Sequence, residues 1–592
     1  MRDVIVIGAG GGGPVVAKEL AERGLDVLVL EAGARHANPE QEWSALENHM
    51  NSSLSGKLRF GPSDPAKPAW FREQTTTGSF SQVAGVGGTT LHYYGNSPRA
   101  MPGVFAGYHG RDRRMYDHRH KFPFSYDEMR RYYEWTEATL PVQTAAMGTK
   151  EKAFFDAASA SGLQPITGKD ITHAGFRPQE NAILQPGGTA GKTSDASQLN
   201  YPNATGCTLC GHCFQGCMLP KGAPRNLKAR RSTDNSYTPM ALTADLWKPG
   251  GKAITLISDA YVTRILSDRR WGRRMQKATG VEWRDVNTGE VHSEDAKVVV
   301  MAGGCIENPR LWMNSDLPDP NGWVGRGLTD HALDWVTGIF DHDVGGATGT
   351  SCSSRADFPG YGAIQNTANT PGVAANNLAV SDSGIRGAYN NGAGGQGAWD
   401  GEPGRVYGAE LKEMMSNINN QMSILVLTDD DVESHNKVDV SRVFEDDHGP
   451  VARVSIDKRR RSRRTKRNRD FLANKCAEIL RAAGARKIVR TDWAPVLLHL
   501  QSSMRMGDHH RNSVLDENCE ARAVEGLFIA DNSALPNSLG GPNPTLSTQS
   551  LATRTAEKIF QQYFGGDPWV GKESPICSID DVVTQAVINR GL

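Results

Sequence analysis

The first thirty-one residues constrain the fold of this chain more than any other stretch. Val4 to Ile7 form a short apolar run, and Gly8 to Gly13 follow at once with five glycines. Apolar side chains then recur at helical spacing from Val15 to Arg23, and a second apolar run, Val27 to Leu30, ends in Glu31. This order predicts a β-strand, a glycine turn, an α-helix and a second strand, which together begin a parallel α/β sheet.

The turn has the chemistry of a dinucleotide-binding site. Gly8, Gly10 and Gly13 permit a tight turn and a close approach of the backbone to a pyrophosphate, whose charge would sit at the helix N-terminus. Glu31 stands where a carboxylate can accept from the adenosine ribose hydroxyls, and a glutamate there, rather than a nearby arginine, argues against a 2'-phosphate. An ordinary glycine-rich turn is the alternative, and the strand-turn-helix context argues against it. FAD and NAD both remain open at this point.

Length and charge exclude several classes of protein. With 592 residues the chain is too long for one core, so we expect two or three interleaved domains. Lys plus Arg and Asp plus Glu both number 66, a balance that gives no overall attraction to nucleic acid or to a membrane surface. No apolar stretch approaches the roughly 20 residues of a membrane span, and the predicted first strand leaves no room for a signal peptide. We therefore expect a cytoplasmic protein, unless a signal-bearing partner exports it.

A second glycine-rich segment surrounds Gly87 and Gly88. Its glycines allow backbone amides to approach a flat ligand, and Thr89, His92 and Asn96 offer polar contacts to that ligand. By composition alone, a packed glycine-rich loop explains the segment as well as a cofactor contact does.

Four of the nine cysteines fall within eleven residues, at Cys207, Cys210, Cys213 and Cys217. The spacing C-x2-C-x2-C-x3-C is typical of a loop that wraps an iron-sulfur cluster, so these four are the predicted metal ligands. Three thiolates would hold a three-iron (3Fe-4S) cluster and four a four-iron (4Fe-4S) cluster. Zinc, or free or redox-active thiols, are the alternatives, because a zinc site usually has two well-separated pairs.

The last informative block runs from His499 to the helix that begins near Thr548. A predicted strand ends in Asp531, where a carboxylate can reach the ribityl or pyrophosphate edge of a flavin. The helix after Asn543, Pro544 and Thr545 directs its N-terminal amides at whatever precedes it, where they would stabilise negative charge.

A basic run extends from Lys458 to Arg469 and holds nine Lys or Arg. We interpret it as the solvated face of a helix that ends near Arg481, and a docking patch for an acidic redox partner is the alternative.

In their order along the chain, six motifs resemble the glucose-methanol-choline (GMC) oxidoreductases. They are the turn at Gly8 to Glu31, GGTTxH at Gly87 to His92, AGG at Ala302, VGRxLxDH at Val324 to His331, HxxSxxRMG at His499 to Gly507, and NPTLS at Asn543 to Ser547. The resemblance covers nearly the whole chain, and it implies that the cofactor is FAD rather than NAD.

The resemblance also implies roles for single residues. His499 matches the family's active-site histidine, and Asn543 matches the second member of its His-Asn or His-His pair. A histidine near neutral pKa can take the hydroxyl proton of an alcohol while a neutral Asn orients the oxygen. His92 aligns with the position that carries covalently attached flavin in pyranose oxidases of the family, whereas many related dehydrogenases keep a histidine there without a bond to the flavin. The cysteine run resembles an insertion of the sugar dehydrogenase branch, although its spacing departs from the glucose dehydrogenase version.

We therefore expect a mixed α/β protein, α+β in part. A Rossmann-like FAD-binding domain is joined to a discontinuous second, substrate-binding domain built on an antiparallel sheet. The expected segments are an FAD-binding domain at 1–120, 251–334 and 491–565, a substrate-side cap at 121–200, the cysteine-rich insertion at 201–250, a substrate-binding domain at 335–490 and a C-terminal tail at 566–592.

The expected activity is oxidation of a CH-OH group of a sugar, polyol or other alcohol by hydride transfer to flavin. Electrons would leave through the iron-sulfur cluster to an external acceptor, such as a small subunit, a cytochrome or a quinone. An oxygen-using oxidase with a structural or zinc-binding cysteine run is one alternative, and a non-redox FAD-containing lyase is another.

Overall fold

The structure is a computed structural model that describes most of the chain. The described residues are 1–36, 57–59, 61, 66–74, 79–80, 82–108, 115–144, 146–185, 206–213, 217, 223–269, 275–380, 398–400, 408–456, 460–491 and 496–592.

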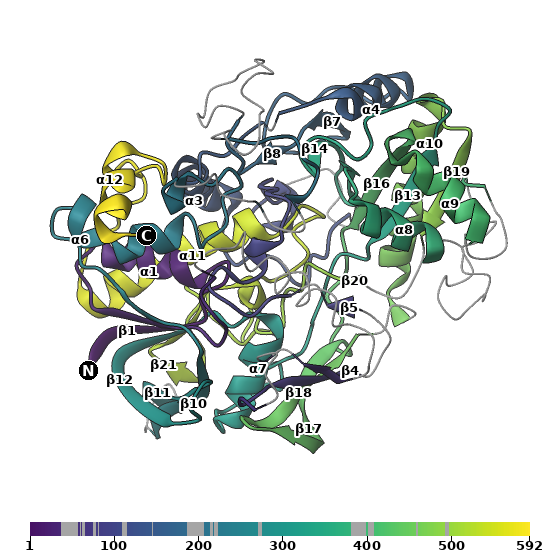
Figure 1. Ribbon diagram of the computed structural model, residues 1–592. Helices are drawn as coiled ribbons and strands as arrows, with labels where there is room; N and C mark the ends of the chain where they lie inside the picture. The colour runs from purple at the N-terminus through teal and green to yellow at the C-terminus, as the bar shows by residue number, and fades with distance from the viewer. Residues whose placement is uncertain are drawn as a thin grey trace.

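The molecule has two halves, each built around one sheet. In the first half, on the left of Figure 1, a parallel sheet forms the centre. Its strands are β1 (Arg2–Ile7), β2 (Val27–Leu30), β9 (Thr255–Ile257), β12 (Val291–Met301) and β22 (Leu527–Ile529). They lie in the order β22-β12-β1-β2-β9, and all four neighbouring pairs are parallel. The central strands β1 and β2 are largely buried, which explains why they appear in the sequence as continuous apolar runs. The predicted strand-turn-helix-strand unit is therefore present, with α1 at Gly13–Ala21.

An antiparallel hairpin extends this sheet. Strands β10 (Ala260–Arg269) and β11 (Gln276–Asp285) pair with each other, and β11 pairs with the first half of β12. In the sequence, short alternating runs at Ile254 to Ile257, Tyr261 to Ile265 and Ala278 to Trp283 predict an antiparallel meander, and that prediction is wrong for the first run. That strand, β9, instead pairs parallel with β2 and so forms an edge of the nucleotide-type sheet.

The second half is built on a six-stranded sheet in which every pair is antiparallel. The order is β19 (Lys487–Thr491), β13 (Asp334–Ile339), β16 (Gln421–Thr428), β15 (Gly362–Thr367), β14 (Cys352–Phe358) and β7 (Gly175–Pro178). Helix α10 (Arg463–Ala482) packs against β13 and β16, on the right of Figure 1. The mixed α/β architecture with an antiparallel second sheet confirms the predicted fold class.

The remaining elements are helices and strands outside the two strand orders just given. Helix α1 packs against α5 (Tyr237–Leu242) and α11 (Thr545–Phe564), and α11 packs against α3 (Tyr126–Thr139). The other helices are α4 (Thr149–Ala160), α6 (Ala244–Trp247), α7 (Gly304–Asn314), α8 (Pro371–Val380), α9 (Gly408–Ser416) and α12 (Asp581–Arg590). The other strands are β3 (Lys57–Arg59), β4 (Phe71–Gln74), β5 (Ser79–Phe80), β6 (Gln143–Thr144), β8 (Glu180–Asn181), β17 (Lys437–Asp446), β18 (Gly449–Ser455), β20 (Val496–Leu497) and β21 (Val524–Glu525).

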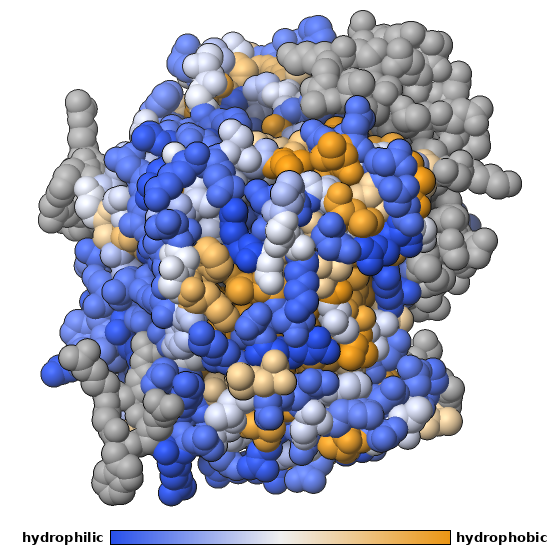
Figure 2. Space-filling model, turned by 90° about the vertical axis from the view of Figure 1, so that its left-hand side faces the viewer, coloured by the Kyte–Doolittle hydropathy of each residue, from blue (hydrophilic) through white to orange (hydrophobic). Residues whose placement is uncertain are grey.

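The C-terminal segment packs against the first half rather than extending from it. Helix α12 contacts α5 and α6, and Asn226 donates a hydrogen bond to the carbonyl of Ser578. Figure 2 shows the face that looks left in Figure 1, where hydrophobic residues occur in several patches separated by hydrophilic ones. Within the described residues, no helix combines the length and the apolar character needed to cross a membrane.

The basic run at the start of α10 is partly buried and partly exposed. Arg461 and Arg469 are buried and form ion pairs with Asp430 and Asp334, respectively. Other members, including Arg463, are exposed, whereas Lys458 and Arg459 lie outside the described residues. The solvated-face interpretation therefore holds for only part of the run, because buried carboxylates pair with the rest.

Candidate functional site

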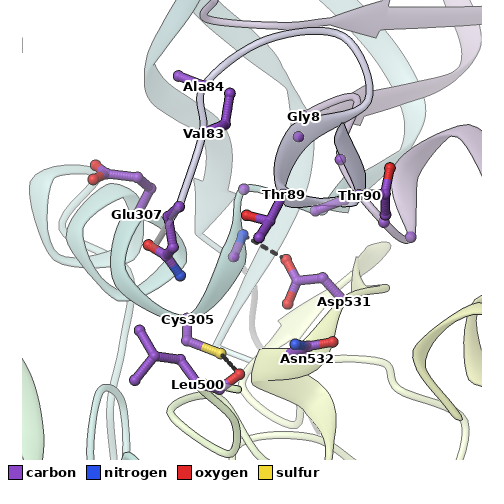
Figure 3. A pocket seen from close by; sticks show the side chains of 18 of the residues that line it. Gly8, Val83, Ala84, Thr89, Thr90, Cys305, Glu307, Leu500, Asp531 and Asn532 are labelled. Carbon is purple, nitrogen blue, oxygen red and sulfur yellow. Dashed lines mark hydrogen bonds between the residues drawn. The ribbon is translucent and has the colours of Figure 1, made fainter. Parts of the chain in front are cut away.

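A pocket opens where β1 and β2 end, at the carboxyl edge of the parallel sheet, as expected for a ligand site in an open α/β sheet. Its lining joins parts of the chain that are hundreds of residues apart, and Figure 3 shows a part of it from close by. Of the sequence-predicted site residues, those that line it are Gly8, Gly10, Glu31, Gly88, Thr89, His92, Asn96, His499, Asp531, Asn543, Pro544 and Thr545.

The glycines of the first turn serve two purposes. A Cβ on Gly12 would lie 1.7 Å from the carbonyl oxygen of Ala530, and one on Gly8, whose φ is +102°, would lie 2.5 Å from that of Ala302. These two positions require glycine because the turn is packed directly against neighbouring strands. A Cβ on Gly10 or Gly11, by contrast, would meet nothing nearer than 4.0 or 3.6 Å, so these two residues leave a cradle open to the pocket.

The second glycine-rich segment packs directly against the first. The N-H of Gly87 donates to the carbonyl of Ala9 at 2.7 Å, and a Cβ on Gly88 would lie 2.7 Å from the Cα of Gly10. Helix η1 (Gly88–Leu91) then carries Thr89 and Thr90 along the pocket wall, as Figure 3 shows. Gly13 and Gly87 do not line the pocket, and we assign them to the packing of the two turns.

Glu31 lies at the end of β2 and is buried. Its carboxylate accepts hydrogen bonds from the N-H of Ala9 at 2.7 Å and of Gly33 at 2.9 Å. Burial raises its pKa to about 7, against the lowering effect of these donors. The carboxylate thus holds the glycine turn in shape while it lines the pocket.

Asp531 follows β22 and anchors the start of α7. Its Oδ2 accepts from the N-H of Gly304 at 2.7 Å and from Nδ2 of Asn308 at 2.8 Å. Its Oδ1 accepts from the N-H and the hydroxyl of Ser533 at 2.8 and 2.5 Å. Burial raises the pKa of this carboxyl. The carboxylate is therefore fixed by protein donors at the pocket wall.

Helix α11 begins at the pocket. Pro544 is its N-cap and Thr545 its first residue, so the unpaired N-H groups of its first turn are presented to the pocket. A helix N-terminus favours negative charge beside it, as the sequence predicted for this position.

His499 and Asn543 meet on the same wall. Nδ2 of Asn543 lies 3.3 Å from Nε2 of His499, and Nδ1 of His499 lies 2.8 Å from Nδ1 of His331. His331 in turn places its Nε2 3.0 Å from the carbonyl oxygen of Ser538.

These contacts assign the tautomers. A carbonyl can only accept, so Nε2 of His331 carries a proton, and in a neutral ring its Nδ1 is then an acceptor. Nδ1 of His499 must therefore donate to His331, which leaves a lone pair on Nε2 of His499 beside the Asn543 amide. Burial lowers the pKa of His331 to about 4, and burial together with His331 lowers the pKa of His499 well below its ordinary value. Both rings are neutral near pH 7.

Asp330 fixes the backbone of both histidines. Its Oδ1 accepts from the N-H of His499 at 2.8 Å and from the N-H of His331 at 2.9 Å. Burial raises the pKa of Asp330 to about 7. The Asp-His pair at 330–331 therefore sets both the position and the tautomer of His499.

The cysteine run lies outside this pocket, and its four cysteines form no disulfide with one another. They lie close enough together that Cys213, Cys217 and Cys210 all add to the effect of burial in raising the pKa of Cys207. Nevertheless, among the residues that the structure describes, no group of three or more side chains is placed to hold a metal ion.

The described part of the run pairs with the backbone of Gly349. Gly211 donates to the carbonyl of Gly349 at 3.0 Å, and Gly349 donates to the carbonyl of Leu209 at 2.9 Å. Cys210, between these two hydrogen bonds, is exposed, and Cys213 is buried. The residues as placed do not fit an iron-sulfur cluster, so that part of the prediction is not supported.

Sequence reasoning missed two polar residues beside the His499 and Asn543 pair. His331 belongs to the VGRxLxDH motif, which by itself predicts no role for this residue. Gln365 on β15 donates to Oδ1 of Asn543 and had no local signal, because the two residues are brought together only by tertiary packing.

Comparisons with known proteins agree with this architecture. Models of the GMC oxidoreductase family match residues 176–333 and 434–552, and a model described as an FAD binding domain matches residues 3–44. The 2-methyl-1,2-propanediol dehydrogenase of Mycolicibacterium austroafricanum is 25% identical over 95% of this chain and 95% of its own length. The fructose dehydrogenase large subunit of Gluconobacter japonicus is 25% identical over 94% of this chain and 97% of its own.

A solved structure shares the fold. The pyridoxine 4-oxidase from Mesorbium loti superposes with a TM-score of 0.56 over 96% of this chain and 100% of its own, at 15% identity. By these matches the chain is similar to the GMC oxidoreductase family, through two of its family models and through relatives that align over nearly the full length, and it shares the fold of the solved oxidase.

Proposed function

We propose that the protein is an FAD-dependent oxidoreductase that oxidises a CH-OH group of an alcohol or sugar. The observation that carries this proposal is the pair formed by Nε2 of His499, which has a lone pair, and Nδ2 of Asn543, which has a donor, 3.3 Å apart on the wall of one pocket. An alcohol hydroxyl needs one acceptor for its proton and one donor for its oxygen, and the pair offers both.

The remaining wall of the pocket suits FAD. Gly10 and Gly11 leave room for a pyrophosphate beside the N-terminus of α1, and Glu31 lies where the family's adenosine ribose would be held. Asp531 and the first turn of α11, which the sequence also predicts to contact the cofactor, line the same pocket. When bound, FAD supplies the acceptor for the hydride that leaves the substrate carbon.

The protein's own residues handle the proton. His499 is neutral near pH 7 because burial and His331 lower its pKa, so Nε2 can accept the hydroxyl proton without first losing one. Nδ2 of Asn543 would donate to the substrate oxygen and stabilise the negative charge that develops there. His331 and Asp330 keep the ring of His499 in the orientation that this transfer needs.

We further propose that the enzyme is a dehydrogenase that passes electrons to an external acceptor, such as a partner subunit, a cytochrome or a quinone. Two full-length relatives named as dehydrogenases, one of them a large subunit, support this proposal. Because the described thiols do not form a ligand set, we derive no electron route through the cysteine run. Iron and sulfide analysis with an EPR spectrum tests the iron-sulfur prediction, and rapid oxygen consumption with substrate would favour the oxidase alternative instead.

The catalytic assignment is tested with His499→Ala. Loss of the base is expected to slow anaerobic flavin reduction by about 10²- to 10⁴-fold at unchanged FAD content. The matched control is His510→Ala, since His510 is exposed. A His499→Ala protein that reduces its flavin as fast as the His510→Ala protein would contradict the role of His499.

A further inference from the structure

We propose that Gln365 is a positioning residue that fixes which way the Asn543 amide faces, and with it the hydrogen-bond donor offered to the substrate oxygen. The inference rests on the proposed function, because it concerns the same site. It is carried by a chain of buried hydrogen bonds that runs from the six-stranded sheet to the pocket.

Gln365 lies on β15 with its side chain completely buried. Its Nε2 donates to Oδ1 of Asn543 and, at 3.2 Å, to Oε1 of Gln179. Its own Oε1 accepts from Nδ2 of Asn96 at 3.2 Å. Each polar atom of this amide thus has a partner inside the protein.

A guanidinium sets which atom donates and which accepts in each of these hydrogen bonds. Arg355 donates to Oε1 of Gln179 at 3.0 Å and is held in place by ion pairing with Asp357. A guanidinium can only donate, so the atom of Gln179 that it meets must be the oxygen. That same oxygen also accepts from Gln365, so the atom that Gln365 presents there must be its nitrogen.

The same reasoning continues to the active site. The Gln365 nitrogen has a second hydrogen, which it gives to Asn543, so the atom of Asn543 that meets it must be the oxygen. Nδ2 of Asn543 is then the atom that faces Nε2 of His499. A reversed amide would set its oxygen against the lone pair of His499, an arrangement in which neither atom can donate.

The test is a double-mutant cycle on anaerobic flavin reduction, with Gln365→Leu and Asn543→Ala made singly and together. Alone, Gln365→Leu is expected to slow reduction by about tenfold, the effect of one misdirected hydrogen bond. In the Asn543→Ala background it is expected to have no further effect, because the residue acts through Asn543. An equal slowing in both backgrounds would overturn the proposal.

A second variant keeps the size of the side chain. In Gln365→Glu, an ionised carboxylate cannot donate to Asn543, but a protonated one can. The ratio of variant to wild-type reduction rate is therefore expected to rise as the pH falls, a signature that a merely structural role would not give. The control is Asn366→Asp, since Asn366 is the next residue on β15 and donates instead to the carbonyl of Lys150. A ratio that does not change with pH would contradict the proposal.

A crystal structure of Gln365→Leu separates this inference from the proposed function. If no alcohol or sugar reduces the wild-type flavin, the proposed function fails, yet the orientation of the Asn543 amide can still be read from its hydrogen bonds. Loss of the 3.3 Å contact between Asn543 and His499 would support the positioning role, and an unchanged contact would overturn it.

Discussion

The His499 region and the cysteine run were both predicted from short motifs, and they differ in what holds their side chains. His499 and Asn543 are fixed from several elements at once, by Asp330, His331 and Gln365. The thiols of the cysteine run approach one another, but the backbone pairing with Gly349 leaves Cys210 facing solvent. The comparison teaches that motif spacing predicts a site well only where buried partners from elsewhere in the chain direct the functional atoms.

The largest expected effect is on folding, and it distinguishes two glycines of the same turn. Gly12→Ala should abolish the folded, FAD-loaded protein, because the new Cβ would lie 1.7 Å from a backbone oxygen. Gly11→Ala has space for its Cβ, so it should fold and show only weakened FAD affinity. Thermal unfolding and flavin absorbance of the two purified variants measure this difference. A stable, fully loaded Gly12→Ala protein would show that the turn is not packed as described.

The donor of the catalytic pair is tested by Asn543→Asp. The substitution keeps the shape but replaces the Nδ2 donor with an acceptor, so flavin reduction should slow by about 10- to 100-fold. Asn589→Asp on the exposed end of α12 is the control and should change nothing. A rate within twofold of wild type for Asn543→Asp would remove Asn543 from the chemistry.

The dependence of flavin reduction on pH tests the neutral state of His499. Since its pKa is lowered, the Nε2 lone pair is available across the neutral range, and the single-turnover rate should stay level there and fall only at acid pH, as the ring gains a proton. Asp330, with a pKa of about 7, titrates inside that range, so Asp330→Asn is measured beside the wild type. A rate that climbs steadily above pH 7 in both proteins would mean that another group is the base.

The smallest effect on flavin reduction is expected for substitutions in the cysteine run. Cys210→Ser should leave single-turnover flavin reduction within about twofold of wild type, because the run lies outside the pocket. A thiol reagent should modify the exposed Cys210 before the buried Cys213, whose pKa is raised by burial. Protection of all four thiols in the purified protein would instead indicate that they are bound to a metal.

Much of the fold follows from local sequence. The strand-turn-helix-strand unit was predicted because its apolar spacing and its glycines lie within one short stretch. Helix α3 likewise begins at a local signal, since Ser125 caps it by accepting from the N-H of Glu128. The place of β9 was missed, since strand pairing is a long-range property that the Ile254 to Ile257 run does not encode.

The candidate site was predictable only in part. His499 and Asn543 were named from motifs, whereas Gln365 comes from a strand 178 residues away from Asn543 and carries no local pattern. Burial and the partners of each side chain decide the tautomers and amide directions, and these appear only when the two halves of the molecule are packed together.

The most direct test of this account is anaerobic mixing of the purified, FAD-loaded protein with a panel of alcohols and sugars while the flavin absorbance is followed. The account predicts that at least one member of the panel bleaches the flavin and is converted to the corresponding carbonyl compound in equal amount. A flavin that dithionite reduces but no member of a broad panel does would contradict the proposed oxidation of a CH-OH group.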